Sequence, residues 1–149
     1  GIALQTHDDH FDYPFKVDIQ LTNVGGPSAG LAFTLGVLDA LSTGRLTGGH
    51  KVAVTGTIDL DGTVGPIGGI ALKTVAVERA GADVFIVPKD TGIPGDELQY
   101  SAAAAKARGH HLKVYAVGTL DDALNVLRSI GGDLSGVTGA TPAPAHAAG

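Results

Sequence analysis

A serine stands directly after a turn of two glycines and a proline, in the run Gly25-Gly26-Pro27-Ser28-Ala29-Gly30. Leucines recur at helical spacing after this turn, so we expect Ser28 at the N-terminus of a helix. Free backbone N–H groups and the helix dipole favour negative charge there, which suits a nucleophilic hydroxyl beside an oxyanion hole. A serine in this position is also typical of an ordinary N-cap, so the segment leaves both interpretations open.

Lys73 is the second residue with an unusual setting. On an ideal wheel of a helix over 69–80, it falls among alanine and valine side chains, away from Thr74 and Glu78. A lysine on such a face either extends to water or is desolvated, and desolvation lowers the pKa of an amine. A fall of about 2–3 units from about 10.4 would make it a base near neutral pH. Together, Ser28 and Lys73 predict a Ser–Lys dyad for attack on a carbonyl.

Three other patterns give weaker signals. His7-Asp8-Asp9-His10 combines two kinds of metal ligand, but it lies in a polar terminal stretch, so we expect no metal site. A Ser–His–Asp triad could draw on one of three histidines that flank predicted strands in polar, turn-like contexts: His50, His110 and His111. A phosphate-binding P-loop needs glycine before its lysine, and Leu72 stands there instead.

Hydrophobic periodicity and turn signals predict the elements that must position these residues. Alternation and short apolar runs predict strands over 15–21, 51–55, 84–87 and 112–117. Helical spacing predicts helices over 28–43, 69–80, 97–108 and 119–130. Asp61-Gly62 predicts a type I′ hairpin turn within 58–64. This order predicts an α+β fold, a mixed α/β domain with helices packed on a sheet.

Composition and charge limit the class of protein. The chain has 149 residues, of which 44% are hydrophobic and 17% charged, and this excludes a chain that is disordered throughout. A net charge of −5 without a basic run argues against nucleic-acid and anionic-membrane partners. Cysteine is absent, which removes thiol chemistry and disulfides. No apolar run reaches the roughly 20 residues of a membrane span.

The chain is expected to hold one structured domain over 15–131. Residues 1–14 are polar and patternless, and we interpret them as the remnant of a linker. Residues 132–149 are rich in glycine, alanine and proline, which predicts a disordered tail. The chain starts with glycine and contains no methionine, so we expect a processed product or an excised domain.

The two candidate segments resemble a known family. Gly26-Pro27-Ser28-Ala29-Gly30 resembles the catalytic-serine motif of Lon proteases, and the stretch over 52–73 resembles the segment that carries their catalytic lysine. The order and spacing of the motifs agree with that family, and the resemblance covers residues 15–130. The runs NVGGPSAGL, LTGGHKVAVTGTIDLDGTVGPIGG and GADVFIVP are similar to the membrane-anchored, PDZ-domain-containing Lon-like serine proteases of bacteria.

This resemblance implies a set of site residues. By it, Ser28 is the nucleophile, Lys73 is the general base, and Thr55 is a threonine whose hydroxyl lies near the lysine amine. It also implies an oxyanion hole made by the backbone N–H groups of Gly26, Pro27, Ser28 and Ala29. It implies no metal and no cofactor, and a fold similar to the second domain of a small-subunit ribosomal protein.

The chain departs from ATP-dependent Lon proteases at two positions. Gly25 precedes the motif glycine and Leu72 precedes the lysine, where that branch has acidic residues. We therefore expect a serine endopeptidase that acts on unfolded or flexible proteins, without ATP within this chain. Two alternatives stay open: a small-molecule kinase or phosphate-binding domain that uses the Gly-rich turn, and a catalytically inactive peptide-binding module.

The resemblance also carries expectations about the parent protein. In that branch a membrane segment and a PDZ domain precede the catalytic domain. We therefore expect a soluble fragment here and a parent anchored in the bacterial cell membrane, with the protease domain outside the cytoplasm. Lon relatives form hexameric rings, which implies a homo-oligomer as a candidate assembly.

Overall fold

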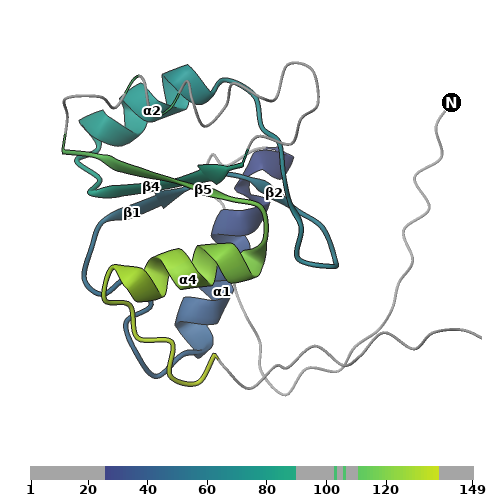
Figure 1. The fold of residues 1–149 in the computed structure, drawn as a ribbon, viewed down its shortest axis with the longest axis vertical. Helices are drawn as coiled ribbons and strands as arrows, with labels where there is room; N and C mark the ends of the chain where they lie inside the picture. Colours follow the sequence, from purple (N-terminus) through teal and green to yellow (C-terminus); the bar gives the residue numbers. More distant parts are fainter. Residues whose placement is uncertain (1–25, 90–102, 104–105, 107–110, 138–149) are drawn as a thin grey trace, which may run out of the picture.

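A parallel three-stranded sheet lies at the centre of the computed structural model, which describes residues 26–89, 103, 106 and 111–137 (Figure 1). Its strands are β1 (Val52–Val54), β4 (Val84–Pro88) and β5 (Lys113–Val117), in the order β1-β4-β5. All five residues of the middle strand are buried. A strand covered on both faces is a continuous apolar run rather than an alternating one, as the sequence predicts for this segment.

Helices cover both faces of the sheet, α2 (Ile70–Arg79) on one and α1 (Gly30–Leu41) with α4 (Leu120–Ser129) on the other (Figure 1). The side chains of β4 alternate between two hydrophobic clusters. Val84 and Ile86 join the cluster that includes α1 and α4, and Phe85 and Val87 join the one that includes α2. This arrangement confirms the predicted fold class, helices packed on a sheet.

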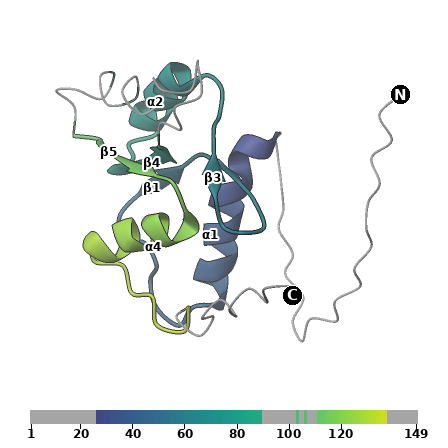
Figure 2. The ribbon, with the colours of Figure 1, turned by 45° about the vertical axis from the view of Figure 1, so that its right-hand side comes forward.

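A short antiparallel hairpin, β2 (Thr57–Ile58) and β3 (Val64–Gly65), follows β1 and lies beside the start of α1 (Figure 2). Two backbone bonds join it to the segment between β5 and α4. The amide of Val64 donates to the carbonyl of Gly118 at 2.9 Å, and the amide of Leu120 donates to the carbonyl of Gly62 at 2.9 Å. These bonds fix the hairpin relative to the sheet.

The predicted type I′ turn in this hairpin is wrong. The amide of Gly62 donates to the carbonyl of Asp59 at 2.9 Å, so Leu60 and Asp61 are the central turn residues and Gly62 follows them. Gly62 has a φ of 84°, a conformation that favours glycine. The loop is therefore longer than a two-residue turn, and Gly62 provides the left-handed residue that such loops need.

The last helix begins at a capping box. The hydroxyl of Thr119 accepts a bond from the amide of Asp122 at 3.1 Å, and the Asp122 carboxylate accepts one from the amide of Thr119 at 3.2 Å. These bonds satisfy amides that the first turn leaves unpaired. The observed bounds Leu120–Ser129 agree with the predicted helix over 119–130.

Packing continues past the predicted end of the domain at residue 131. Leu134 is buried in the cluster of α1 and α4, and the amide of Asp133 donates to the carbonyl of Arg45 at 3.0 Å. Gly132 makes this possible, because a Cβ atom there would collide with the carbonyl oxygen of Leu46. The predicted tail therefore begins too early, since Leu134 and the partly buried Val137 pack against this cluster.

Several predicted segments lie outside the described residues: the strand over 15–21, the stretch over 1–14, the tail from 138 onward and most of the helix over 97–108. Within that last range, Ala103 and Lys106 are helical. Across the ranges that are described, no helix combines the length and the apolar character that a bilayer crossing requires.

Candidate functional site

Ser28 lies in a single turn of 3-10 helix, Pro27–Ala29, which leads into α1. Gly26 precedes it with a φ of 96°, a left-handed conformation that favours glycine and that lets the chain turn sharply. Pro27 then fixes its own φ at a value that suits the first residue of a helix. The amide of Gly30 donates to the carbonyl of Pro27 and closes the turn. The glycines and the proline of the motif therefore set the direction in which the Ser28 side chain points at the start of the helix.

Bonds from the segment after β1 fix the backbone of Ser28. Its carbonyl oxygen accepts from the amide of Gly56 at 2.8 Å and from the hydroxyl of Thr55 at 3.1 Å. The carbonyl of Gly56 in turn accepts from the amide of Leu31 at 3.1 Å. Gly56 has a φ of 156°, and a Cβ atom there would lie 2.9 Å from a methyl carbon of Val64. A side chain at this position would therefore press on Val64 of the hairpin.

Lys73 lies in the first half of α2, after the turn Gly65-Pro66-Ile67-Gly68-Gly69. Gly69 has a φ of 70°, which is again the left-handed region. The two residues next to Lys73 on the helix have opposite environments: Leu72 is 79% exposed and Thr74 is 0% exposed. Lys73 is half-buried between them. Its amine is therefore at the boundary between the core and the solvent, close to the serine turn.

The structure brings three predicted site residues together. Lys73 Nζ donates to Ser28 Oγ at 3.1 Å and lies 3.5 Å from Thr55 Oγ1. Ser28 is half-buried, and Thr55 is buried and extends the β1–β4 pairing by donating its amide to the carbonyl of Ile86 at 3.0 Å. The three side chains come from three separate segments, the start of α1, the end of β1 and α2, so only the tertiary fold makes them neighbours.

The predicted oxyanion hole needs one correction. Pro27 has no amide hydrogen, so its backbone cannot donate to an oxyanion. Ala29 already donates its amide to the carbonyl of Gly26, although the distance is long at 3.5 Å. Of the predicted set, the amides of Gly26 and Ser28 are the remaining candidates, and their role stays a prediction.

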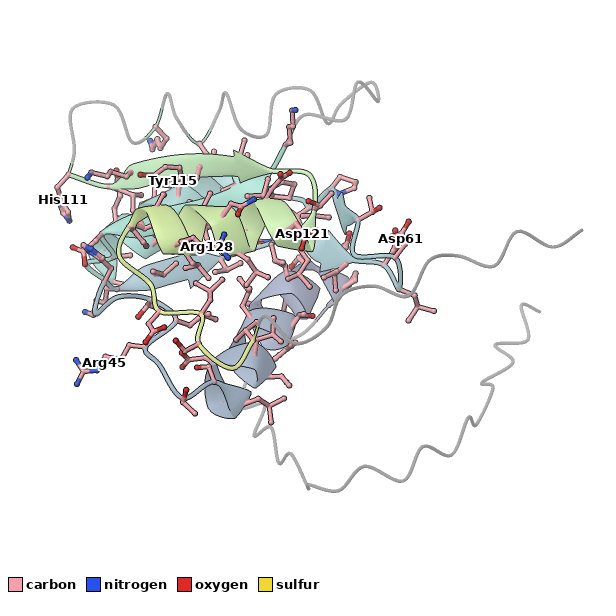
Figure 3. All side chains as sticks on the ribbon, turned by 60° about the horizontal axis from the view of Figure 1, so that its bottom comes forward. Arg45, Asp61, His111, Tyr115, Asp121 and Arg128 are labelled. Atoms are coloured by element: carbon pink, nitrogen blue, oxygen red, sulfur yellow. The ribbon has the colours of Figure 1, made fainter. Side chains whose placement is uncertain are left out.

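The described histidines lie at the other end of the sheet. His50 precedes β1 and His111 precedes β5, and the strands are parallel, so both residues are at the amino ends. Thr55 follows the carboxyl end of β1, roughly 15 Å from His50 along an extended chain. Figure 3 shows His111 and Asp61 at opposite ends of the molecule. Neither described histidine can therefore form a triad with Ser28.

The remaining weaker candidates gain no support. His110 and the stretch His7-Asp8-Asp9-His10 lie outside the described residues. Within the described ranges, no group of three or more histidine, cysteine or acidic residues is arranged to hold a metal ion. Asp59 and Asp61 are exposed at the hairpin, as predicted for turn residues.

A cavity of about 550 Å³ opens beside the Ser28–Lys73 pair. Its other walls come from residues that the sequence analysis did not single out: Thr57, Pro66, Ile67 and Gly68. These residues belong to the hairpin and to the turn before α2, which the sequence analysis treated as connections. Their proximity to the turn that holds Ser28 depends on how the hairpin folds back, and no periodic pattern in the sequence reports that.

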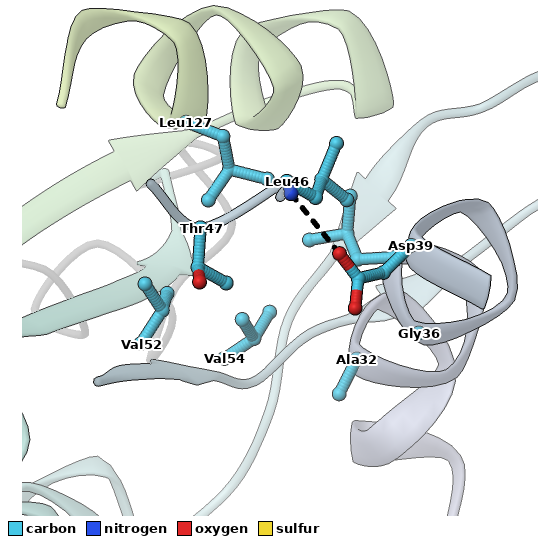
Figure 4. A pocket seen from close by; sticks show the side chains of 9 residues that line it. Ala32, Gly36, Asp39, Leu46, Thr47, Val52, Val54 and Leu127 are labelled. Atoms are coloured by element: carbon cyan, nitrogen blue, oxygen red, sulfur yellow. Dashed lines mark hydrogen bonds between the residues drawn. The ribbon is translucent and has the colours of Figure 1, made fainter. Parts of the chain in front are cut away.

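A second pocket, of about 200 Å³, lies between α1, β1 and α4 (Figure 4). Its walls are mostly aliphatic, and the Asp39 carboxylate at its side accepts a bond from the amide of Leu46 at 3.1 Å. That bond holds the connection after α1. The described residues of this pocket include neither Ser28 nor Lys73, so it is separate from the candidate site.

Comparison with known proteins gives a consistent result. Residues 10–128 match the family described as the Lon protease (S16) C-terminal proteolytic domain. Lon protease 1 of Sorangium cellulosum is 39% identical over 121 residues, which are 81% of this chain and 13% of that protein. Lon protease of Haemophilus influenzae is 31% identical over 124 residues, which are 83% of this chain and 14% of that protein. Lon protease of Clostridium acetobutylicum is 47% identical over 64 residues, which are 43% of this chain and 8% of that protein.

The fold and the site define an α+β domain in which a hydroxyl at the start of one helix faces an amine on another. This chain belongs to the Lon protease family, and the part that matches is the C-terminal proteolytic domain. It spans between 8% and 14% of the length of the three relatives just described.

Proposed function

We propose that this domain is a serine peptidase in which Ser28 is the nucleophile and Lys73 is the general base. The observation that carries the proposal is the 3.1 Å distance between Lys73 Nζ and Ser28 Oγ, which is within reach for direct proton transfer. Membership of the Lon protease family supports peptide-bond hydrolysis as the reaction.

The hydrogen-bond pattern supports a role for Thr55 in orienting the amine. A threonine hydroxyl has one hydrogen, and Thr55 donates it to the carbonyl of Ser28. Toward Lys73, Thr55 Oγ1 can therefore only accept. To act as a base, the amine gives one hydrogen to Thr55 and accepts the hydroxyl hydrogen of Ser28 on its lone pair, which reverses the direction of the Lys73–Ser28 hydrogen bond described above. The Thr55 hydroxyl thus fixes the serine backbone through one hydrogen bond and orients the base through another.

In the proposed cycle, Ser28 Oγ bonds to the carbonyl carbon of the substrate while its proton passes to Lys73 Nζ. The C–N bond then breaks, and the leaving amine takes that proton. A water molecule next attacks the ester on Ser28 and gives a proton to Lys73. Collapse of this second intermediate releases the acid and returns the proton to Ser28. The amides of Ser28 and Gly26 are the candidate donors to the oxyanion.

The substrate and the parent protein belong to the same proposal. An extended, unfolded or flexible segment is the substrate that an open cavity on the surface can receive, and such segments also dock by adding to a sheet edge. Four further parts of the proposal rest on the resemblance of the sequence alone. They are activity without ATP within this chain, a parent with a PDZ domain and a membrane anchor, a protease domain outside the cytoplasm, and a hexameric ring.

The test removes each partner in turn. Ser28→Ala and Lys73→Ala should each lower the hydrolysis of an unfolded protein and of a fluorogenic peptide by at least about 10³-fold, because each removes an essential chemical group. Matched variants far from the pair, Ser129→Ala and Lys113→Ala, should keep the wild-type rate. Circular dichroism should show the same fold in all four.

A second readout separates a peptidase from an inactive binding module. A serine-reactive acylating probe should add its mass to the peptide that contains Ser28, and Lys73→Ala should slow this labelling by a similar factor. Wild-type rates in Lys73→Ala would remove lysine from the mechanism. Thermal stabilisation by a nucleotide, without labelling of Ser28, would favour the phosphate-binding alternative.

A further inference from the structure

The cavity beside the Ser28–Lys73 pair is in the right place for a substrate side chain. Both members of the pair line it. In an acyl intermediate the substrate carbonyl is bonded to Ser28 Oγ, so the side chain next to that carbonyl must lie within a few ångströms of Ser28. The cavity is the described space that meets this condition.

The walls of the cavity are almost free of charge. Among the described residues that line it, Lys73 alone is ionisable, and its amine already contacts Ser28 and Thr55. Pro27, Pro66 and Ile67 offer apolar surface, and Ile67 is buried. The proline rings are rigid, so they cannot adjust to different substrate side chains. Outside the Ser28–Lys73 pair, Thr57 and Ile67 are the wall residues with side chains that can turn, and Ile67 is packed in the core.

Thr57 faces a glycine across the hairpin. The register pairs Thr57 of β2 with Gly65 of β3, and opposite residues of an antiparallel pair have side chains on the same face. The backbone of Gly65 is not in the left-handed region, so its conformation does not require glycine. The reason for glycine is space, because a Cβ atom at Gly65 would collide with Thr57 Oγ1. The hydroxyl of Thr57 thus occupies the room that a side chain at position 65 would take.

We infer that the Thr57–Gly65 pair sets the size of the substrate side chain that the cavity accepts next to the scissile carbonyl. The inference rests on the proposed peptidase function and adds a specificity determinant to it. Because Gly65 has no side chain, the Thr57 hydroxyl lies against the backbone of Gly65. A side chain at position 65 would force Thr57 to turn, and the cavity that it lines would become narrower.

The experiment uses peptides that differ only at the residue before the scissile bond, alanine in one and phenylalanine in the other. Relative to wild type, Gly65→Ala should lower the phenylalanine-to-alanine ratio of kcat/KM by roughly tenfold, and Thr57→Ala should raise it by a similar factor. Thr57→Val keeps the size of the side chain and should keep the ratio within about twofold.

The double variant Gly65→Ala/Thr57→Ala distinguishes this role from general damage. Without the hydroxyl, the nearest neighbour of the new Cβ atom is the Cβ atom of residue 57 at 3.8 Å, an ordinary contact. The double variant should therefore regain the ratio of Thr57→Ala. Gly36→Ala is the matched control, because Gly36 lies on α1 with open space around it, and it should leave the ratio unchanged.

The outcomes separate the two proposals. A wild-type protein that cleaves neither peptide and is not acylated at Ser28 overturns the peptidase function, and the specificity role falls with it. A wild-type protein that cleaves both peptides, with the same ratio in Gly65→Ala, Thr57→Ala and the double variant, overturns the specificity role alone. A loss of rate for both peptides in Gly65→Ala that Thr57→Ala does not rescue makes Gly65 purely structural, which also overturns it.

Discussion

The two ends of the central sheet hold polar side chains in different ways. At the carboxyl end, Ser28, Thr55 and Lys73 are half-buried or buried, and their side-chain atoms lie 3.1–3.5 Å apart. At the amino end, the side chains of His50 and Asp83 are 45% and 51% exposed, with 3.9 Å between Nδ1 and Oδ2. One end has side chains packed against one another, and the other has a loose pair in solvent.

The partners of these groups also differ. At the amino end, the Asp83 carboxylate accepts from the amide of Lys51 at 3.0 Å, and Lys51 Nζ donates to the carbonyl of Ala80 at 3.1 Å. Both bonds satisfy backbone groups where loops join the sheet. At the carboxyl end, the bond between Lys73 and Ser28 joins two side chains. Bonds to the backbone stabilise a fold, whereas an amine held against a hydroxyl can move a proton, so the comparison favours the carboxyl end for the proposed chemistry.

Of the changes that test this comparison, removal of the Thr55 hydroxyl should have the largest effect on activity. Thr55→Val keeps the shape of the side chain but loses both the acceptor for Lys73 and the donor to the carbonyl of Ser28, so neither the amine nor the serine backbone is held as before. A lost hydrogen bond of about 1–3 kcal/mol corresponds to a fall in kcat of roughly 5- to 150-fold. Steady-state kinetics should show this fall in kcat with little change in KM, because Thr55 does not line the substrate cavity.

Thr55→Ser is the matched control for this prediction. It keeps the hydroxyl and should retain kcat within a few-fold. If Thr55→Val equals the wild type, the hydroxyl does not orient the base. If Thr55→Ser loses as much activity as Thr55→Val, packing of the methyl group is the cause instead.

Variants at the amino end should leave catalysis unchanged. His50→Ala should change the free energy of unfolding by less than about 0.5 kcal/mol, because an exposed pair at this distance contributes little. Asp83→Ala should cost about 1 kcal/mol, since the amide of Lys51 loses its partner. Urea unfolding and peptidase assays check both values. A loss of activity without a matching loss of stability in either variant would extend the functional site across the sheet.

Sequence patterns predicted the parts of the fold that depend on one segment at a time. The apolar run over 84–87 predicted a buried strand, and the threonine and aspartates at 119–122 predicted a helix start, because each signal is local. Ser28 and Lys73 were paired first by their local settings and then by the resemblance of their motifs. The wheel put Lys73 on an apolar side, but its direction toward Ser28 depends on how Gly69 turns the chain into α2, and no local pattern reports that turn.

Close approaches between distant segments could not be predicted. Gly56 and Gly65 are needed because of neighbouring atoms from other strands, and a glycine in a sequence does not say what lies against it. Leu134 was assigned to a tail because its neighbours are polar, although it packs in the core together with Val137 and backbone bonds hold the residues between them. The proline in the predicted oxyanion hole is a different case, because covalent chemistry alone excludes it as a donor.

A change at Asp61 should have the smallest effect of these predictions. It tests the comparison between packed and exposed polar side chains, because Asp61 lies on the hairpin but is exposed. The amide of Thr63 donates to its carboxylate at 2.9 Å and holds the pKa of Asp61 below its ordinary value of 3.8. A lowered pKa in the folded state means that the carboxylate stabilises the fold above about pH 4 and that this contribution is lost as the pH falls through the lowered value. Asp61→Asn should therefore be slightly less stable than wild type at pH 7, with a difference that shrinks toward pH 3, while kcat stays the same. A difference in unfolding free energy that is constant over this range would show that the carboxylate charge plays no part, and a fall in kcat would show that exposed groups on the hairpin also belong to the site.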